Sequence, residues 1–217
     1  MKSRQTGFTL VEIAIVLVII GLLLGGVLKG QELINSAKVK NLANDFRTIP
    51  IYIYGYQDRF RALPGDDANV VAHLGSTAIS APTGVTLGNG VIDGAWDSDE
   101  STESYLFWQH VRLAGFAPGS TDTADKAAYI PRNAEGGKIG VTGTSNVPLK
   151  DLKGNNLRGT YFICSEGISG RFAKQLDLLM DDGNTATGSM MTSRDNKNAV
   201  ATDQVLDGTP YLVCMGV

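Results

Sequence analysis

The sequence predicts an α+β fold in which a long N-terminal helix packs on a C-terminal antiparallel sheet. Two observations carry this prediction. Up to residue 63, apolar residues first run almost continuously and then recur every three or four positions, which is typical of one long helix. In the last third of the chain, short runs rich in β-branched and aromatic residues alternate with glycine turns, which is typical of antiparallel strands.

The first element is the segment 8–28, which is apolar apart from Thr9, Glu12 and several glycines. Its length matches what a helix needs to cross a bilayer. Lys2 and Arg4 precede it without any acidic residue, and basic residues before a first span hold that end in the cytoplasm. The rest of the chain is therefore expected outside the cytoplasm, and the carboxylate inside the span marks a functional position.

A short basic leader ends in Gly7, and Phe8, Thr9 and Glu12 open the apolar run. This pattern resembles the N-terminus of the type IV prepilin superfamily, which includes pilins and the pseudopilins of type II secretion. The resemblance covers about the first thirty residues. It implies a pilin-like fold, cleavage between Gly7 and Phe8 by a membrane prepilin peptidase, and methylation of the new amine of Phe8. An unrelated single-span anchor is the alternative, and it leaves these residues unexplained.

The resemblance also implies a role for Glu12 in assembly. A carboxylate in apolar surroundings needs a partner, and the Phe8 amine of a neighbouring subunit would supply one and set the stagger between subunits.

We therefore divide the chain into a cleaved leader (1–7), a transmembrane and filament-core helix (8–28), an amphipathic continuation of that helix (29–63) and an extracytoplasmic globular α+β domain (64–217). By resemblance the protein is a structural subunit of a type IV pilus-like filament, or else a minor pilin or a type II secretion pseudopilin. The implied location is the inner membrane with a periplasmic domain, and after assembly an extracellular pilus or a periplasmic pseudopilus.

The implied partners are other pilin subunits, the prepilin peptidase, an inner-membrane assembly platform with its ATPase, and membrane lipid before assembly. The net charge of −3 and a pI near 5.4 give no basic surface for nucleic acid. The two histidines, His73 and His110, lie in no metal-binding or catalytic motif, so we predict no enzyme. From another class, a membrane-anchored surface-binding or adhesive module stays open, with Trp96 and the acidic loops as contacts.

Within the segment 29–63, apolar residues form one stripe on a helix. We expect this stripe to pack on the domain's own sheet, and a coiled coil with a partner is the alternative. The stripe consists of Val39, Leu42, Phe46, Ile49, Ile53, Tyr56, Phe60 and Leu63.

The globular part is expected to contain a short helix over Asp66–Leu74 with Asp66 as its N-cap, and further helices over Ser101–Ala114 and Gly170–Met180. Three stretches, 63–75, 88–94 and 176–188, look like stretches of large prepilin-type proteins. The expected strands are Ala128–Pro131, Lys138–Thr142, Thr160–Ser165, Ser189–Thr192 and Tyr211–Met215.

The two cysteines, Cys164 and Cys214, both fall in expected strands. Two cysteines in an extracytoplasmic domain most often form a disulfide. Pilins often carry a C-terminal disulfide loop of this kind. Two free buried thiols are the alternative.

An acidic segment partly follows the calcium-loop template, with Asn89, Asp93, Asp97 and Glu100 at its first, fifth, ninth and twelfth places. Val91 occupies the third place and cannot ligate through its side chain. Calcium is thus the one cofactor that the sequence suggests, and a solvated acidic loop is the alternative.

Overall fold

The computed structural model describes residues 9–82, 86–194 and 200–217. The chain divides into two compact units, Met1–Lys38 and Val39–Val217, and the division falls inside the first helix. The elements in chain order are α1 (Leu10–Phe60), α2 (Val70–Leu74), α3 (Glu103–Leu113), α4 (Lys126–Tyr129), β1 (Ile139–Gly143), the 3₁₀ turn η1 (Thr144–Asn146), β2 (Tyr161–Ser169), α5 (Gly170–Met180), β3 (Met190–Ser193) and β4 (Pro210–Gly216).

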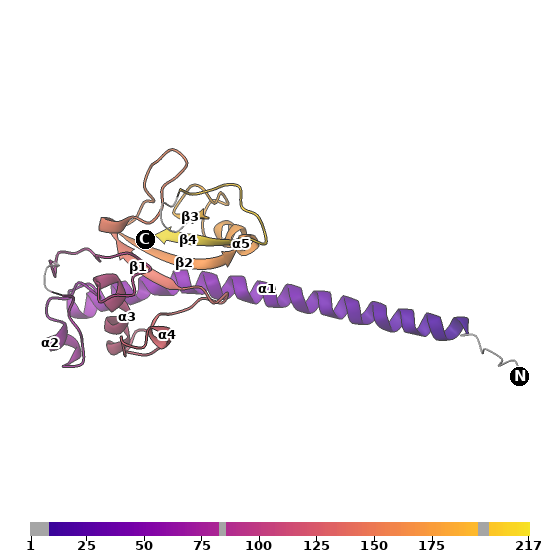
Figure 1. Ribbon diagram of the computed structural model, residues 1–217, viewed down its shortest axis with the longest axis horizontal. Coiled ribbons are helices and arrows are strands. Elements are labelled where there is room, and N and C mark those ends of the chain that lie inside the picture. Colours follow the sequence, from indigo (N-terminus) through magenta and orange to yellow (C-terminus); the bar gives the residue numbers. More distant parts are fainter. Residues whose placement is uncertain (1–8, 83–85, 195–199) are drawn as a thin grey trace, which may run out of the picture. The chain divides into compact units, whose positions relative to one another are not determined.

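The four strands form one sheet in the order β1-β2-β4-β3, and every neighbouring pair is antiparallel. Figure 1 shows the sheet and α5 in the C-terminal part of the chain, drawn in salmon to yellow. This arrangement confirms the predicted α+β class with an antiparallel C-terminal sheet. Four of the five expected strands are present, with ends shifted by one to four residues, and α5 has the predicted bounds.

The expected strand Ala128–Pro131 is wrong. Residues Lys126–Tyr129 form the helical turn α4 instead, because the Asp125 carboxylate accepts a hydrogen bond from the backbone N–H of Ala128 at 3.2 Å. The hydroxyl of Tyr129 is buried and donates to the carbonyl oxygen of Tyr105 at 2.7 Å. An N-cap and one buried aromatic residue thus set the conformation of this short apolar run.

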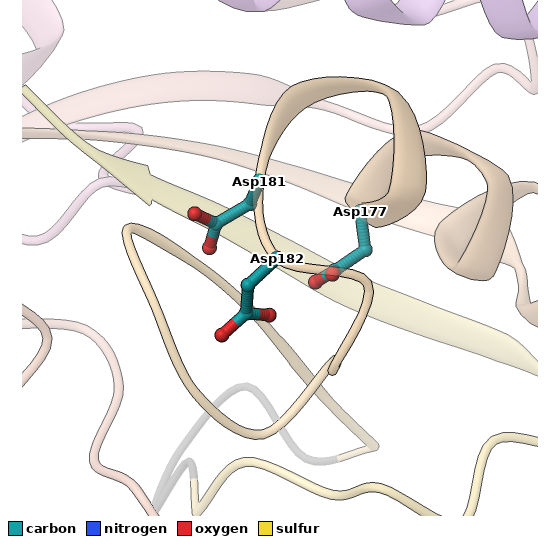
Figure 2. A group of neighbouring side chains, drawn as sticks. All are labelled: Asp177, Asp181 and Asp182. Carbon is teal, nitrogen blue, oxygen red and sulfur yellow. The ribbon is translucent and has the colours of Figure 1, made fainter.

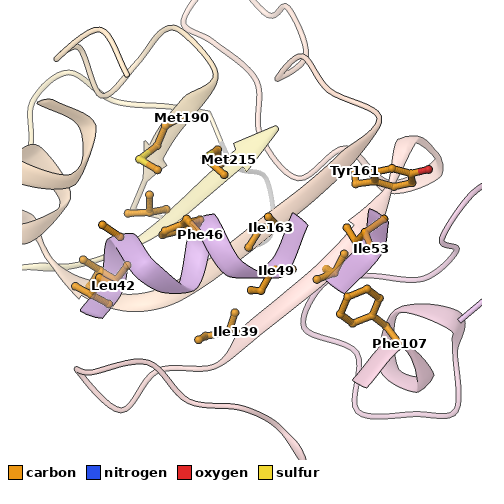
Figure 3. Close-up of a cluster of buried hydrophobic side chains, with 14 of the residues drawn as sticks. Leu42, Phe46, Ile49, Ile53, Phe107, Ile139, Tyr161, Ile163, Met190 and Met215 are labelled. Carbon is orange, nitrogen blue, oxygen red and sulfur yellow. The ribbon is translucent and has the colours of Figure 1, made fainter. Parts of the chain in front are cut away.

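The apolar stripe on the second half of α1 packs against the domain's own sheet, as predicted. Figure 3 shows Leu42, Phe46 and Ile49 beside side chains of the strands, including Ile139 and Ile163. These α1 side chains are at most 3% exposed. The helix ends at Phe60, three residues before the expected end, because Arg61 adopts a left-handed conformation with φ of 55°.

The other face of the sheet carries a second apolar cluster, built from alternate strand residues such as Phe162 and Leu212 and from the long connections between strands. Cys164 and Cys214 belong to this cluster and face one another across β2 and β4. Their sulfur atoms form the predicted disulfide, which links the last strand to the centre of the sheet.

Candidate functional site

The first half of α1 exposes a continuous apolar surface in the unit Met1–Lys38. Its large apolar side chains from Leu10 to Ile34 have exposed fractions between 46% for Ile20 and 90% for Leu10. Among the described residues, α1 is the one helix long and apolar enough to cross a membrane. This unit buries little of its apolar surface within the chain itself, so the surface is available to lipid or to other chains.

Thr9 and Glu12 form a capping box at the start of α1. The Glu12 carboxylate accepts hydrogen bonds from the backbone N–H and the hydroxyl of Thr9, both at 2.8 Å. In return the Thr9 hydroxyl accepts from the backbone N–H of Glu12 at 3.3 Å. Glu12 therefore helps to begin the helix, a role that the sequence reasoning did not assign to it. The predicted cleavage and methylation positions, Gly7 and Phe8, lie outside the described residues.

Asp66 does not cap α2, which begins at Val70 and has Asn69 at its N-cap position. The Asp66 carboxylate instead accepts hydrogen bonds from three successive backbone N–H groups, those of Gly88, Asn89 (3.2 Å) and Gly90 (2.7 Å). Successive amides of this kind form a nest that holds an anionic oxygen. The stretches 63–75 and 88–94 therefore meet in one contact, in which the Asp66 side chain is buried and the three donating residues are exposed.

The neighbouring carboxylate of Asp67 links α2 to α1. It accepts hydrogen bonds from the Tyr56 hydroxyl at 2.7 Å and from the backbone N–H of Asn69 at 2.8 Å, and it lies 2.6 Å from Nδ1 of His73. A cleft of about 460 Å³ borders this Asp67–His73 pair. No Ser, Thr or Cys lines that cleft among the described residues, so the pair has no nucleophile beside it of the kind such pairs activate.

His110 is buried, and both of its ring nitrogens are occupied. Nδ1 accepts a hydrogen bond from the backbone N–H of Gly65 at 2.9 Å, so Nε2 carries the proton and donates to the carbonyl oxygen of Ile79 at 2.9 Å. Burial lowers the pKa of His110, which keeps the ring neutral. Gly65 has a φ of 96° and lies against the Glu103 carbonyl, where a Cβ would overlap. His110 therefore fixes the chain that follows α1.

Glu103 begins α3 as a fully buried carboxylic acid. One carboxylate oxygen accepts the backbone N–H of Asp93 at 2.7 Å, whereas the other has no hydrogen-bond partner. Burial raises the pKa of Glu103 to about 7, the Asp93 amide opposes that shift, and the nearby charges of Asp66 and Asp93 add to it. Glu103 is therefore a described acid that changes its charge near neutral pH.

The predicted calcium loop is a folded turn around the nest that holds Asp66. The side-chain oxygen of Asn89 accepts the backbone N–H of Val91 at 2.7 Å, and its amide nitrogen donates to Asp93 at 3.3 Å. Among the described residues, Asp93, Asp97 and Glu100 do not form a group of three carboxylates whose ligand atoms approach one another within 4.8 Å. Calcium binding by this loop stays a prediction.

The structure brings together a group that the sequence reasoning missed. The ligand atoms of Asp177, Asp181 and Asp182 all lie within 4.8 Å of one another. Figure 2 shows the three side chains at the end of α5 and in the turn that follows. The sequence reasoning took Asp181–Gly183 only as a turn signal. The sequence feature that could have indicated this group is the position of Asp177. It lies beside the apolar face of α5 and near its carboxyl end, where the helix dipole makes a negative charge unfavourable.

Comparison with protein-family models finds one match, to the prokaryotic N-terminal methylation motif, over residues 2–28. Those residues carry the type IV prepilin signature, as the resemblance of the leader indicated, and the match supports a pilin or pseudopilin. Comparisons with curated proteins and with solved structures find no match.

Proposed function

We propose that this chain, whose N-terminus carries the type IV prepilin signature, is a structural subunit of a type IV pilus-like filament. The observation that carries the proposal is the combination of that signature with an apolar helical surface from Leu10 to Ile34 that the chain itself leaves exposed. A prepilin peptidase cleaves after Gly7 and methylates Phe8. The apolar surface is covered by inner-membrane lipid before assembly and by other subunits afterwards.

Burial of the apolar surface supplies the driving force for assembly. Each large aliphatic side chain moved from water to an apolar contact contributes about 1.5–3 kcal/mol, but transfer from lipid to protein contributes much less. Close packing and polar contacts therefore decide the arrangement within the filament. The space beside four glycines of α1 is open, because a Cβ there would meet no atom of the described chain within 4 Å; these are Gly21, Gly25, Gly26 and Gly30. A neighbouring helix can therefore approach the backbone closely at these positions.

Glu12 sets the register between subunits. In the single chain, the Glu12 carboxylate accepts two hydrogen bonds from Thr9, each 2.8 Å long. Both of these bonds end on Oε2, so Glu12 keeps the capping box while its other oxygen, Oε1, accepts the charged Phe8 amine of a neighbour. That pairing neutralises two charges in an apolar core, and an incorrect stagger leaves both of them unpaired.

The filament-forming machinery acts in trans. The sequence holds no nucleotide-binding loop, so an inner-membrane platform with its own ATPase extracts the subunits. The unit Val39–Val217 is placed in the periplasm and then on the filament surface. A minor pilin or pseudopilin shares every one of these features, and the abundance of the chain in purified filaments separates it from a main subunit.

Glu12 variants test the proposal in cells that contain the peptidase and the platform. We expect Glu12→Ala and Glu12→Gln to be processed normally but to reduce sheared filaments about tenfold or more, since a lost buried ion pair corresponds to several kcal/mol. The glutamine variant keeps the capping box and lacks the charge, so it isolates the ion pair. Glu32→Ala, an exposed glutamate paired with Lys29 in the same helix, is the matched control. Normal filament yield from both Glu12 variants would contradict the proposed register contact.

A further inference from the structure

We propose that Asp177, Asp181 and Asp182 form a binding site for a hard divalent cation, with calcium as the expected ion. All three aspartates belong to the unit Val39–Val217, so cation binding by their carboxylates does not depend on filament assembly. The site lies at the carboxyl end of α5 and shares no residue with the segment 89–100 that the calcium-loop template selects.

The first reason is an unpaired buried carboxylate. Asp177 is fully buried, and neither of its side-chain oxygens has a hydrogen-bond partner. Buried polar atoms are almost always paired, so two unpaired oxygens on one buried carboxylate require an explanation. Figure 2 shows the Asp177 carboxylate directed toward Asp182, and ligand atoms of all three aspartates lie within 4.8 Å of one another. Oxygens bound to one calcium ion at 2.3–2.6 Å are at most about 5 Å apart, so this spacing fits.

The second reason is the local charge. Three carboxylates gather at the carboxyl end of a helix, where the unpaired carbonyl groups add further negative potential. Among the ion pairs between described residues, none involves Asp177, Asp181 or Asp182. A bound divalent cation would relieve the repulsion among the three carboxylates.

The other two carboxylates are already oriented by the turn that follows α5. Asp181 accepts hydrogen bonds from the Ser189 hydroxyl at 3.0 Å and from the backbone N–H of Met190 at 2.8 Å. Asp182 accepts from the backbone N–H of Asn184 at 2.8 Å and from the Thr187 hydroxyl at 2.9 Å. Each oxygen keeps a free lone pair, and metal-binding carboxylates are commonly held by such outer hydrogen bonds.

The donor atoms decide the class of ion. All of the charged donors are carboxylate oxygens, which suit calcium, magnesium or manganese rather than zinc or copper. Calcium accepts six to eight oxygens in irregular geometry, whereas magnesium requires a nearly ideal octahedron. A site built from one helix end and one loop fits calcium better, and water would complete the coordination.

The ion would join two elements of the fold. Asp177 belongs to α5, while Asp181 bonds to Met190, the first residue of β3. Gly188 has a φ of 87°, and a Cβ there would overlap Asp181, so the turn is closely fitted around this carboxylate. Binding therefore fixes the end of α5 against the start of the edge strand.

Calorimetric titration of the full chain in detergent with calcium chloride tests the site, after removal of divalent ions with EDTA. We expect one ion bound with a Kd of about 0.1–1 mM, in the range of extracellular calcium modules. At 10 mM calcium the Tm should rise by about 3–10 °C, and potassium chloride at equal ionic strength should not reproduce the rise.

Asp177→Asn and Asp182→Asn should each weaken calcium binding about tenfold or more, because affinity depends on ligand charge. In EDTA the Asp177→Asn protein should melt no lower than the wild type, since the amide removes a repelled buried charge, so weaker binding would not reflect misfolding. Asp203→Asn, an exposed aspartate, and Glu100→Gln in the segment 89–100 are controls that should bind normally. Absence of binding, binding unchanged in both aspartate variants, or binding lost only in Glu100→Gln would overturn the proposal.

Discussion

The stability of the unit Val39–Val217 should fall as the pH rises from 5 to 8, because Glu103 is buried without full hydrogen bonding. Its pKa of about 7 lies above the ordinary value of 4.5. Between these two values the folded state binds more protons than the unfolded state, so the stabilisation is present at low pH and is lost as the pH rises through 7. Each pKa unit corresponds to about 1.4 kcal/mol, and with allowance for screening Glu103 contributes about 1–3 kcal/mol over this range. Asp45, whose pKa burial raises to about 6, adds to the effect in the same direction.

Thermal or denaturant unfolding of the full chain in detergent measures this dependence, at fixed ionic strength and with EDTA present. A loss of 1–3 kcal/mol corresponds to a fall in Tm of about 2–12 °C for a domain of this size. Glu103→Gln should flatten the dependence, whereas Glu100→Gln, an exposed glutamate three residues away, should leave it unchanged. A stability that rises with pH between 5 and 8, or a slope that Glu103→Gln does not alter, would refute the reasoning.

Two further changes test contacts inside the same unit. Asp66→Ala should destabilise it by about 2–4 kcal/mol in denaturant unfolding, because the N–H groups of Gly88, Asn89 and Gly90 lose their acceptor, partly offset by the removal of a buried charge. A change below about 0.5 kcal/mol would show that the nest does not hold the loop. Replacing both Cys164 and Cys214 by Ser should lower stability by about 2–4 kcal/mol, since the disulfide closes a loop with a separation of 50 residues, and an unchanged unfolding midpoint would contradict this.

The features that the sequence predicted correctly are those with a long repeating pattern. The exposed run at the start of α1, the stripe from Val39 to Tyr56 and four strands all carry such patterns, and burial of many residues supports each of them. The match to the N-terminal methylation motif, over residues 2–28, includes the same apolar run. The disulfide was predicted for a different reason, because two cysteines in an extracytoplasmic domain most often pair, and the structure places them opposite one another on β2 and β4.

The errors concern single polar residues whose hydrogen-bond partners or burial the local pattern does not reveal. Asp66 has the sequence context of an N-cap, yet three amides more than twenty residues away take its carboxylate. Asp125 changes a short apolar run from a strand into the turn α4. Asp177 is notable only once its burial is known, since its side chain lies against a turn that the sequence indicates only as irregular. Local patterns do not contain tertiary partners of this kind.

The mass of the mature N-terminus tests the central claim most directly. The full chain is produced together with a prepilin peptidase, recovered from the membrane and analysed by intact-mass and N-terminal peptide mass spectrometry. The proposed function predicts a chain that begins at Phe8 and carries one methyl group on its amine. An uncut chain, or one cut after the apolar run, would contradict it, because the helix would then be a plain anchor or a secretory signal.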